Sequence, residues 1–111
     1  MIACRNIRTP FLFLLLAIFL SGADGPSMPK SAEDYYWNGK NKYHNGQYRE
    51  AIEDYNKAAE LAPDVAKIFG SRAAAKRKLG DRDGAIADAQ KAARLGDQDA
   101  QRILRILGYD W

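Results

Sequence analysis

The stretch Gly46–Leu61 reads GQYREAIEDYNKAAEL, and it decides the fold of this chain. Ala51, Tyr55 and Ala58 follow one another at spacings of four and three residues, so a helix would place them on one face. Two small residues on either side of a large ring form a stripe against which another helix can pack closely. The stretch therefore predicts one half of a tightly packed pair of helices.

The same pattern returns farther along the chain in Gly80–Leu95, which reads GDRDGAIADAQKAARL. Seven of the eleven residues in Ala51–Leu61 are identical in the second copy, all at the same offset. The identical pairs are Ala51/Ala85, Ile52/Ile86, Asp54/Asp88, Lys57/Lys91, Ala58/Ala92, Ala59/Ala93 and Leu61/Leu95. An internal repeat of this length predicts a stack of helical pairs.

The period and the residue types resemble the tetratricopeptide repeat, a helix–turn–helix unit of about 34 residues. In residues 32–65, the positions that carry the resemblance are Tyr35, Gly39, Gly46, Tyr48, Ala51, Tyr55, Ala58 and Pro63. Residues 66–97 form the second repeat, which keeps Phe69, Ala73, Gly80, Ala85 and Ala92. This copy lacks the family's aromatic residue at Ala89 and its proline at Asp97, so its core should be weaker. The alternative is two unrelated helical hairpins that are similar by chance, and the match of the period to that of the family argues against it.

The resemblance implies an all-α fold, a tetratricopeptide-like solenoid of helical hairpins with a C-terminal capping helix. Helices are expected over about 32–45, 48–61, 65–79, 82–95 and 98–107. Ser31, Asp64 and Asp97 are the predicted N-caps, and Gly46, Gly80, Gly96 and Gly108 are the predicted helix ends. Ala100, Ile103, Leu104 and Leu107 share one face of the last helix, so residues 98–111 should form a capping helix and tail that seal the stack.

Residues 1–23 are expected to be a signal peptide rather than part of the solenoid. Arg5 and Arg8 precede an unbroken apolar run, residues 11–20, and Ser21-Gly22-Ala23 supplies the small residues that a signal peptidase reads. Cleavage after Ala23 would leave an exported protein, periplasmic if the source is bacterial and otherwise secreted, with residues 24–31 as a Pro/Gly linker. The alternative is a membrane anchor through residues 11–20, although this run is short for a bilayer.

The composition argues against several classes of function. Cys4 is the only cysteine and would leave with the signal, and His44 is the only histidine, so neither a disulfide nor a metal site is expected. Removing Arg5 and Arg8 leaves 15 of the 17 Lys/Arg against 14 Asp/Glu, a net charge of +1. A nearly neutral mature chain has no global field that would direct it to nucleic acid.

The residues also contain no recognisable catalytic arrangement. Gly80–Gly84 lacks the Lys-Ser/Thr ending of a phosphate-binding loop. Solvated charges on helix surfaces, among lysines, are the expectation for Glu50, Glu53, Asp54 and Asp88. His44 should be exposed at a helix C-terminus. The sequence predicts a protein that is not an enzyme and that takes no cofactor and no small-molecule substrate.

The family resemblance implies a concave groove lined by the first helix of each pair. The residues that this register places on the groove, besides Glu33 and Gly70, are Tyr36, Trp37, Lys40, His44, Lys67, Ser71, Ala74, Arg77 and Lys78. Aromatic, small and basic side chains together predict an acidic peptide partner with an apolar or aromatic anchor. Some relatives clamp a C-terminal carboxylate, but Tyr36, Lys40 and Ser71 stand where that clamp needs Lys, Asn and Asn. The alternative is that the aromatic residues pack against the chain's own linker and that the charges are simply solvated.

The function that these features predict is an exported, non-catalytic adaptor that binds a protein or peptide. A structural, self-associating part of an envelope assembly is the alternative, and Ile106, Tyr109 and Trp111 would then be buried in a homodimer. A third reading is a cell-wall glycan binder in which Trp37 stacks on sugar.

Overall fold

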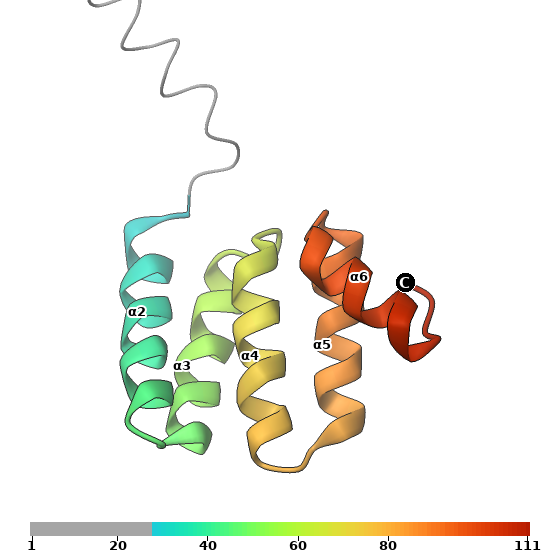
Figure 1. Ribbon diagram of the computed structural model, residues 1–111. Helices are drawn as coiled ribbons and strands as arrows, with labels where there is room; N and C mark the ends of the chain where they lie inside the picture. The colour runs from blue at the N-terminus through green and yellow to red at the C-terminus, as the bar shows by residue number, and fades with distance from the viewer. Residues whose placement is uncertain (1–27) are drawn as a thin grey trace, which may run out of the picture.

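The computed structural model describes residues 28–111, which form five α-helices (Figure 1). The helices are α2 (Lys30–His44), α3 (Tyr48–Leu61), α4 (Ala66–Lys78), α5 (Arg82–Arg94) and α6 (Gln98–Leu107). Two antiparallel hairpins, α2–α3 and α4–α5, stack through α3 and α4, and α6 packs on α5 at the end of the stack. The described residues contain no strand. The predicted all-α solenoid of helical hairpins is confirmed.

The predicted signal peptide, its cleavage site and the first half of the linker, residues 24–27, lie outside the described residues. Within residues 28–111, no helix is long and apolar enough to cross a membrane.

The core of the first hairpin is the stripe on α3. Ala51, Tyr55 and Ala58 are all at most 1% exposed. Gly39 on α2 lies directly against the Tyr55 ring, because a Cβ atom at Gly39 would come within 2.7 Å of Tyr55 Cε1. Burial of the ring, with a smaller contribution from Tyr36, raises the pKa of Tyr55 to about 12. The glycine therefore allows α2 to approach a neutral, buried aromatic ring.

The helix ends agree with the sequence only in part. Gly46 and Gly80 adopt φ values of 80° and 84°, which are left-handed conformations that a glycine adopts without strain, and each ends the first helix of a hairpin as predicted. The carboxylate of Asp97 accepts a hydrogen bond from the Ala100 amide at 2.9 Å, so this predicted N-cap is confirmed. Asp81 also caps α5, by accepting from the Gly84 amide at 3.0 Å, which was not predicted.

The predicted N-caps at Ser31 and Asp64 were wrong. Helix α2 already begins at Lys30, and the Pro29 carbonyl accepts from the Glu33 amide at 2.9 Å. Helix α4 begins one residue later than expected, after Val65, and neither helix has a side-chain cap. Helix α2 starts two residues earlier than a cap at Ser31 requires, and α4 starts one residue later than a cap at Asp64 requires, so each polar side chain misses the position from which it could reach the free amides.

Asp54 and Asp88 are buried, which corrects the expectation that both are solvated. Asp54 is 7% exposed and pairs with Lys42 at 2.7 Å, and Asp88 is 5% exposed and pairs with Lys76 at 3.0 Å. The tight glycine turn folds the second helix of each hairpin back along the first, so the lysine lies opposite the carboxylate. The hydrogen bond with Asp54 raises the pKa of Lys42. The same ion pair thus recurs at the equivalent positions of the second hairpin.

Arg72 on α4 adds a link between the two hairpins. Its guanidinium donates two hydrogen bonds to Asp88, at 2.8 and 2.7 Å, and a third to Asn56 Oδ1 on α3, at 2.9 Å. A bidentate arginine–carboxylate contact with low exposure is geometrically specific.

The capping helix seals the stack incompletely. Ala100 and Leu104 are buried against α5, but Ile103 and Leu107 remain 52% and 53% exposed. Figure 1 shows the reason, because α6 crosses the end of the stack obliquely instead of running parallel to α5. One edge of its apolar face therefore packs, and the other edge does not.

Candidate partner-binding surface

Tyr36 joins the first helices of the two hairpins. Its ring lies 6.0 Å from the Tyr55 ring, and its hydroxyl accepts a long hydrogen bond, 3.4 Å, from Ser71 Oγ on α4. Lys67 Nζ lies 5.2 Å from the centre of the same ring. Tyr36 itself is only 7% exposed. It is therefore a support for the surface rather than the exposed wall that the sequence predicted.

Trp37 is the exposed aromatic residue of this cluster. Its side chain is 51% exposed, and its ring meets the Tyr36 ring edge-on with the centres 5.3 Å apart. Its indole Nε1 donates to Glu33 Oε1 at 3.4 Å. We call the set formed by Trp37, Tyr36, Lys67 and Ser71 the aromatic platform. It presents one large ring that is held from two sides and remains open to solvent.

The other predicted groove residues are not all brought to the aromatic platform. Lys40 is half-buried on α2, whereas His44 and Lys78 are exposed at the C-terminal ends of α2 and α4. Among residues 28–111, no described hydrogen bond, ion pair or ring contact joins these three to the platform. Ala74 and Arg77 instead line a separate pocket farther along the stack.

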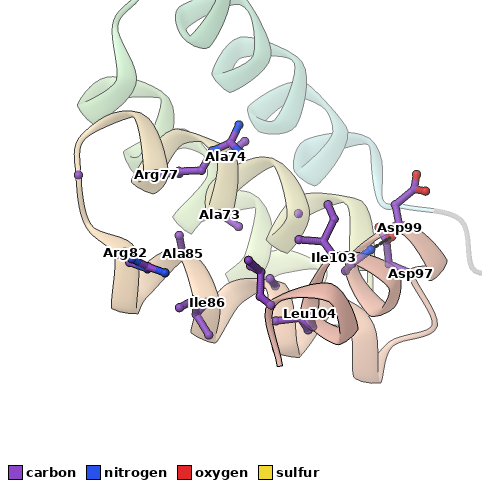
Figure 2. A pocket seen from close by; sticks show the side chains of 15 residues that line it. Ala73, Ala74, Arg77, Arg82, Ala85, Ile86, Asp97, Asp99, Ile103 and Leu104 are labelled. Atoms are coloured by element: carbon purple, nitrogen blue, oxygen red, sulfur yellow. Dashed lines mark hydrogen bonds between the residues drawn. The ribbon is translucent and has the colours of Figure 1, made fainter. Parts of the chain in front are cut away.

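This pocket lies between α4, α5 and α6 and has a volume of about 660 Å³ (Figure 2). We call it the α6 pocket. Its lining consists of Gly70, Ala73, Ala74, Arg77, Gly80, Arg82, Ala85, Ile86, Ala89, Asp97, Asp99, Ala100, Ile103, Leu104 and Leu107. The volume falls in the range of roughly 300–1,000 Å³ that is common for ligand sites.

The α6 pocket exists because the second repeat lacks an aromatic ring. In the repeat register, Ala89 is the equivalent of Tyr55, and Ala73 is the equivalent of Gly39, which the Tyr55 ring covers. Both alanines line the pocket. The sequence did show the departure at Ala89, but the resulting hollow depends also on the tilt of α6. Because the second repeat has alanine in place of the aromatic residue and α6 is tilted, an open apolar cavity remains between α4, α5 and α6.

The charges at the α6 pocket are unequal at its two ends (Figure 2). Arg77 and Arg82 lie beside the α4–α5 turn, and among residues 28–111 no ion pair is described for either. Asp97 and Asp99 lie near the start of α6, where Asp97 caps the helix and Asp99 pairs with Arg102 at 2.7 Å. Within the described part of the chain, the end without an ion pair is therefore the basic one.

The described part of the chain offers no metal centre, because no group of three or more His, Cys, Asp or Glu side chains in it is placed to hold an ion.

Comparison with known proteins agrees with the fold. Residues 32–65 match the family model described as "Tetratricopeptide repeat". Together with the stacked hairpins, this match shows that the chain contains a tetratricopeptide repeat, and proteins with such repeats are generally protein–protein interaction modules and typically non-catalytic.

Several curated proteins are similar to this chain. DnaJ homolog subfamily C member 7 of Mus musculus is 36% identical over 76 residues, which are 68% of this chain and 15% of the mouse protein. Tetratricopeptide repeat protein 36 of Danio rerio is 27% identical over 95 residues, which are 77% of this chain and 51% of that protein. Hsp70-Hsp90 organizing protein of Triticum aestivum is 34% identical over 67 residues, which are 60% of this chain and 12% of that protein. This chain therefore spans about half, or much less, of the length of these relatives.

Proposed function

We propose that this protein is an exported adaptor that binds a protein or peptide partner through the face formed by α2 and α4. The observation that carries the proposal is the aromatic platform, because it holds Trp37 half-exposed on a buried tyrosine. Tryptophan residues that are fixed in place and still accessible are typical anchors of protein interfaces. The presence of a tetratricopeptide repeat supports the same class of function.

The basic residues near this face favour an acidic partner. Lys67 lies on the platform, while Arg77 and Lys78 are exposed toward the end of α4. Opposite charges across an interface mainly accelerate association, and salt screens them. Arg77→Glu should therefore slow binding more than it speeds dissociation, and the effect should fade at high salt.

Export is part of the proposal and rests on the sequence of residues 1–23 alone. The basic residues, the short apolar run and the small residues before Asp24 support it.

Two tryptophan variants test the binding face. The tagged full chain would be recovered from the exported fraction together with its bound proteins, and the affinity of the captured partner would be measured by titration. Trp37→Ala should lose on the order of 2 kcal/mol, roughly thirtyfold in Kd. Trp111→Ala is the matched control, since Trp111 is 40% exposed on the tail after α6. Unchanged affinity for Trp37→Ala would show that the partner does not bind to this face.

The exposed edge of α6 favours one second candidate, a self-associating structural protein. Ile106 is 78% exposed, and Ile103 and Leu107 are about half-exposed beside it. An apolar edge of this kind at the end of a repeat stack is a candidate contact between copies. Sedimentation at several concentrations separates the candidates, because only self-association predicts a dimer without a partner, and Ile106→Lys should then abolish it.

A further inference from the structure

We propose that the α6 pocket binds one aromatic side chain of a protein partner and that Arg77 and Arg82 pair with a carboxylate next to that side chain. The inference rests on the proposed function, and it identifies the place where the partner's apolar anchor is held.

The α6 pocket lies at the positions of the second repeat that correspond to the site of the buried ring in the first repeat. There, the Tyr55 ring packs directly against Gly39 and is 1% exposed, and Gly39 also lies against the backbone of Ala51. The equivalent positions of the second repeat are Ala73, Ala85 and Ala89, and all three line the pocket. A ring supplied by another chain would occupy the space left by the missing aromatic side chain, but the Cβ atom of Ala73, which Gly39 lacks, would hold it farther from α4 than Tyr55 lies from α2.

The lining is suited to an apolar group. Alanine side chains from α4 and α5 lie on one side of the pocket and Ile103 of α6 lies on the other (Figure 2), and Leu107 of α6 also lines the pocket. Ile103 and Leu107 are about half-exposed, so the α6 wall still presents apolar surface to solvent. Insertion of a ring would remove apolar surface from water on both walls, which is the main favourable contribution to binding at such a site.

The charges determine which aromatic partner fits best. Arg77 and Arg82 have no described counter-ion among residues 28–111, whereas Asp97 and Asp99 already have partners within the chain. A carboxylate near the ring therefore gains two free guanidinium groups, while a cation at the other end would compete with Ala100 and Arg102. This difference favours an acidic residue beside the aromatic one.

A second copy of the chain is a less suitable occupant. Ile106 is the most exposed apolar residue of α6, and it does not line the α6 pocket. The edge that another copy would cover is therefore centred outside the pocket and shares only Ile103 and Leu107 with its lining.

The first experiment uses p-cresol, the analogue of a tyrosine side chain, titrated into the isotope-labelled full chain and followed by NMR. We expect amide shifts at Ala85, Ala89 and Leu107. Ala89→Phe places a ring in the pocket and should weaken the binding of p-cresol by about tenfold or more. Ala87→Phe is the matched control, because Ala87 is exposed on the same helix and the added ring lies outside the pocket.

Thermal unfolding accompanies the titration, since a new ring can also disturb folding. A folded Ala89→Phe variant that still binds p-cresol at these residues would overturn the proposal, as would shifts confined to the aromatic platform. If Ala89→Phe does not fold, Ala74→Leu narrows the pocket from α4 and should weaken the binding in the same direction.

The second experiment tests the carboxylate with two capped dipeptides, acetyl-Phe-Glu-amide and acetyl-Phe-Gln-amide. The glutamate peptide should bind several-fold more tightly at low salt, and the difference should disappear at high salt and in Arg82→Gln. Equal affinities at low salt would overturn this part of the proposal.

The outcomes separate this inference from the proposed function. A captured partner that depends on Trp37 but binds Ala89→Phe normally would overturn the inference and leave the function intact. Binding of p-cresol in the α6 pocket, without any captured partner that depends on Trp37, would overturn the proposed function and leave the inference intact. A dimer that Ala89→Phe abolishes would make a second copy the occupant and overturn the proposal.

Discussion

At the scale of single residues, Asp54 and Asp88 show that both repeats contain the same buried ion pair. Each carboxylate is buried against a lysine on the preceding helix, at distances of 2.7 and 3.0 Å. Spacing along one helix could not reveal this, because the lysine comes from another helix and reaches the carboxylate only after the chain turns at a glycine. Ala51 and Tyr55 could be assigned to the core, since their helical periodicity alone places them on the packed face.

Enlarging a side chain in this stripe should separate the helices. Ala51 is 0% exposed, so Ala51→Leu should destabilise the protein by about 1–3 kcal/mol through overpacking. Glu53→Gln, at an exposed position on the same helix, is the control. Equal midpoints of thermal unfolding for the two variants would mean that Ala51 does not lie at a close helix contact.

The buried ring of Tyr55 makes stability depend on alkaline pH. An unfolded tyrosine ionises near pH 10.0, whereas the folded pKa is about 12. Between these values the unfolded chain loses a proton that the folded chain keeps, so stability should fall as pH rises, by up to about 1.4 kcal/mol per pH unit. Denaturant unfolding from pH 9 to 12 measures the effect. Tyr55→Phe removes this contribution, so parallel curves for the two proteins would contradict the prediction.

At the scale of elements, the helices were predictable, and so were the first residues of α3, α5 and α6, whereas those of α2 and α4 were not. The five helices follow from the periodic apolar positions and the glycines between them, and residues 98–107 were predicted without error. The first residue of a helix depends on which group accepts hydrogen bonds from the free amides of the first turn. A shift of one or two residues therefore changes which residue occupies the N-cap position. The tilt of α6 depends on its packing against α5, which no pattern within the helix encodes.

The caps can be tested as a pair. Asp81→Ala removes the oxygen that accepts from the Gly84 amide and should cost about 0.5–2 kcal/mol. Asp64→Ala is the matched control, because α4 has no side-chain cap. Urea unfolding measures both variants, and a loss at Asp64 equal to that at Asp81 would show that the difference between the two helix starts has no energetic effect.

At the scale of the whole molecule, the internal repeat predicted the fold, whereas the departure at Ala89, from which only a weaker core was predicted, lies in the α6 pocket. The aromatic platform was predicted in part, because helix register placed Tyr36, Trp37, Lys67 and Ser71 on one face. Register could not show that Tyr36 is covered by its neighbours and Trp37 is not. Nor could the register show that Ala74 and Arg77 line the α6 pocket instead of the aromatic platform. Both facts depend on how neighbouring helices approach one another.

Export should remove the start of the chain. Because small residues precede Asp24, the mature protein is expected to begin at Asp24. Intact mass and N-terminal sequencing of the exported species measure this directly. A membrane-retained product that still contains residues 11–20 would instead favour an anchor.

Arg72 has a consequence for how this chain can be divided. One guanidinium holds Asp88 in its own hairpin and Asn56 in the hairpin before it. A fragment that stops at Leu61 would lose the arginine altogether, and a fragment that starts at Ala66 would keep it with only one of its two partners. The repeat unit that is so clear in the sequence is therefore not an interchangeable module. Transplanting either hairpin into another repeat protein would require a new partner on each side of the cut.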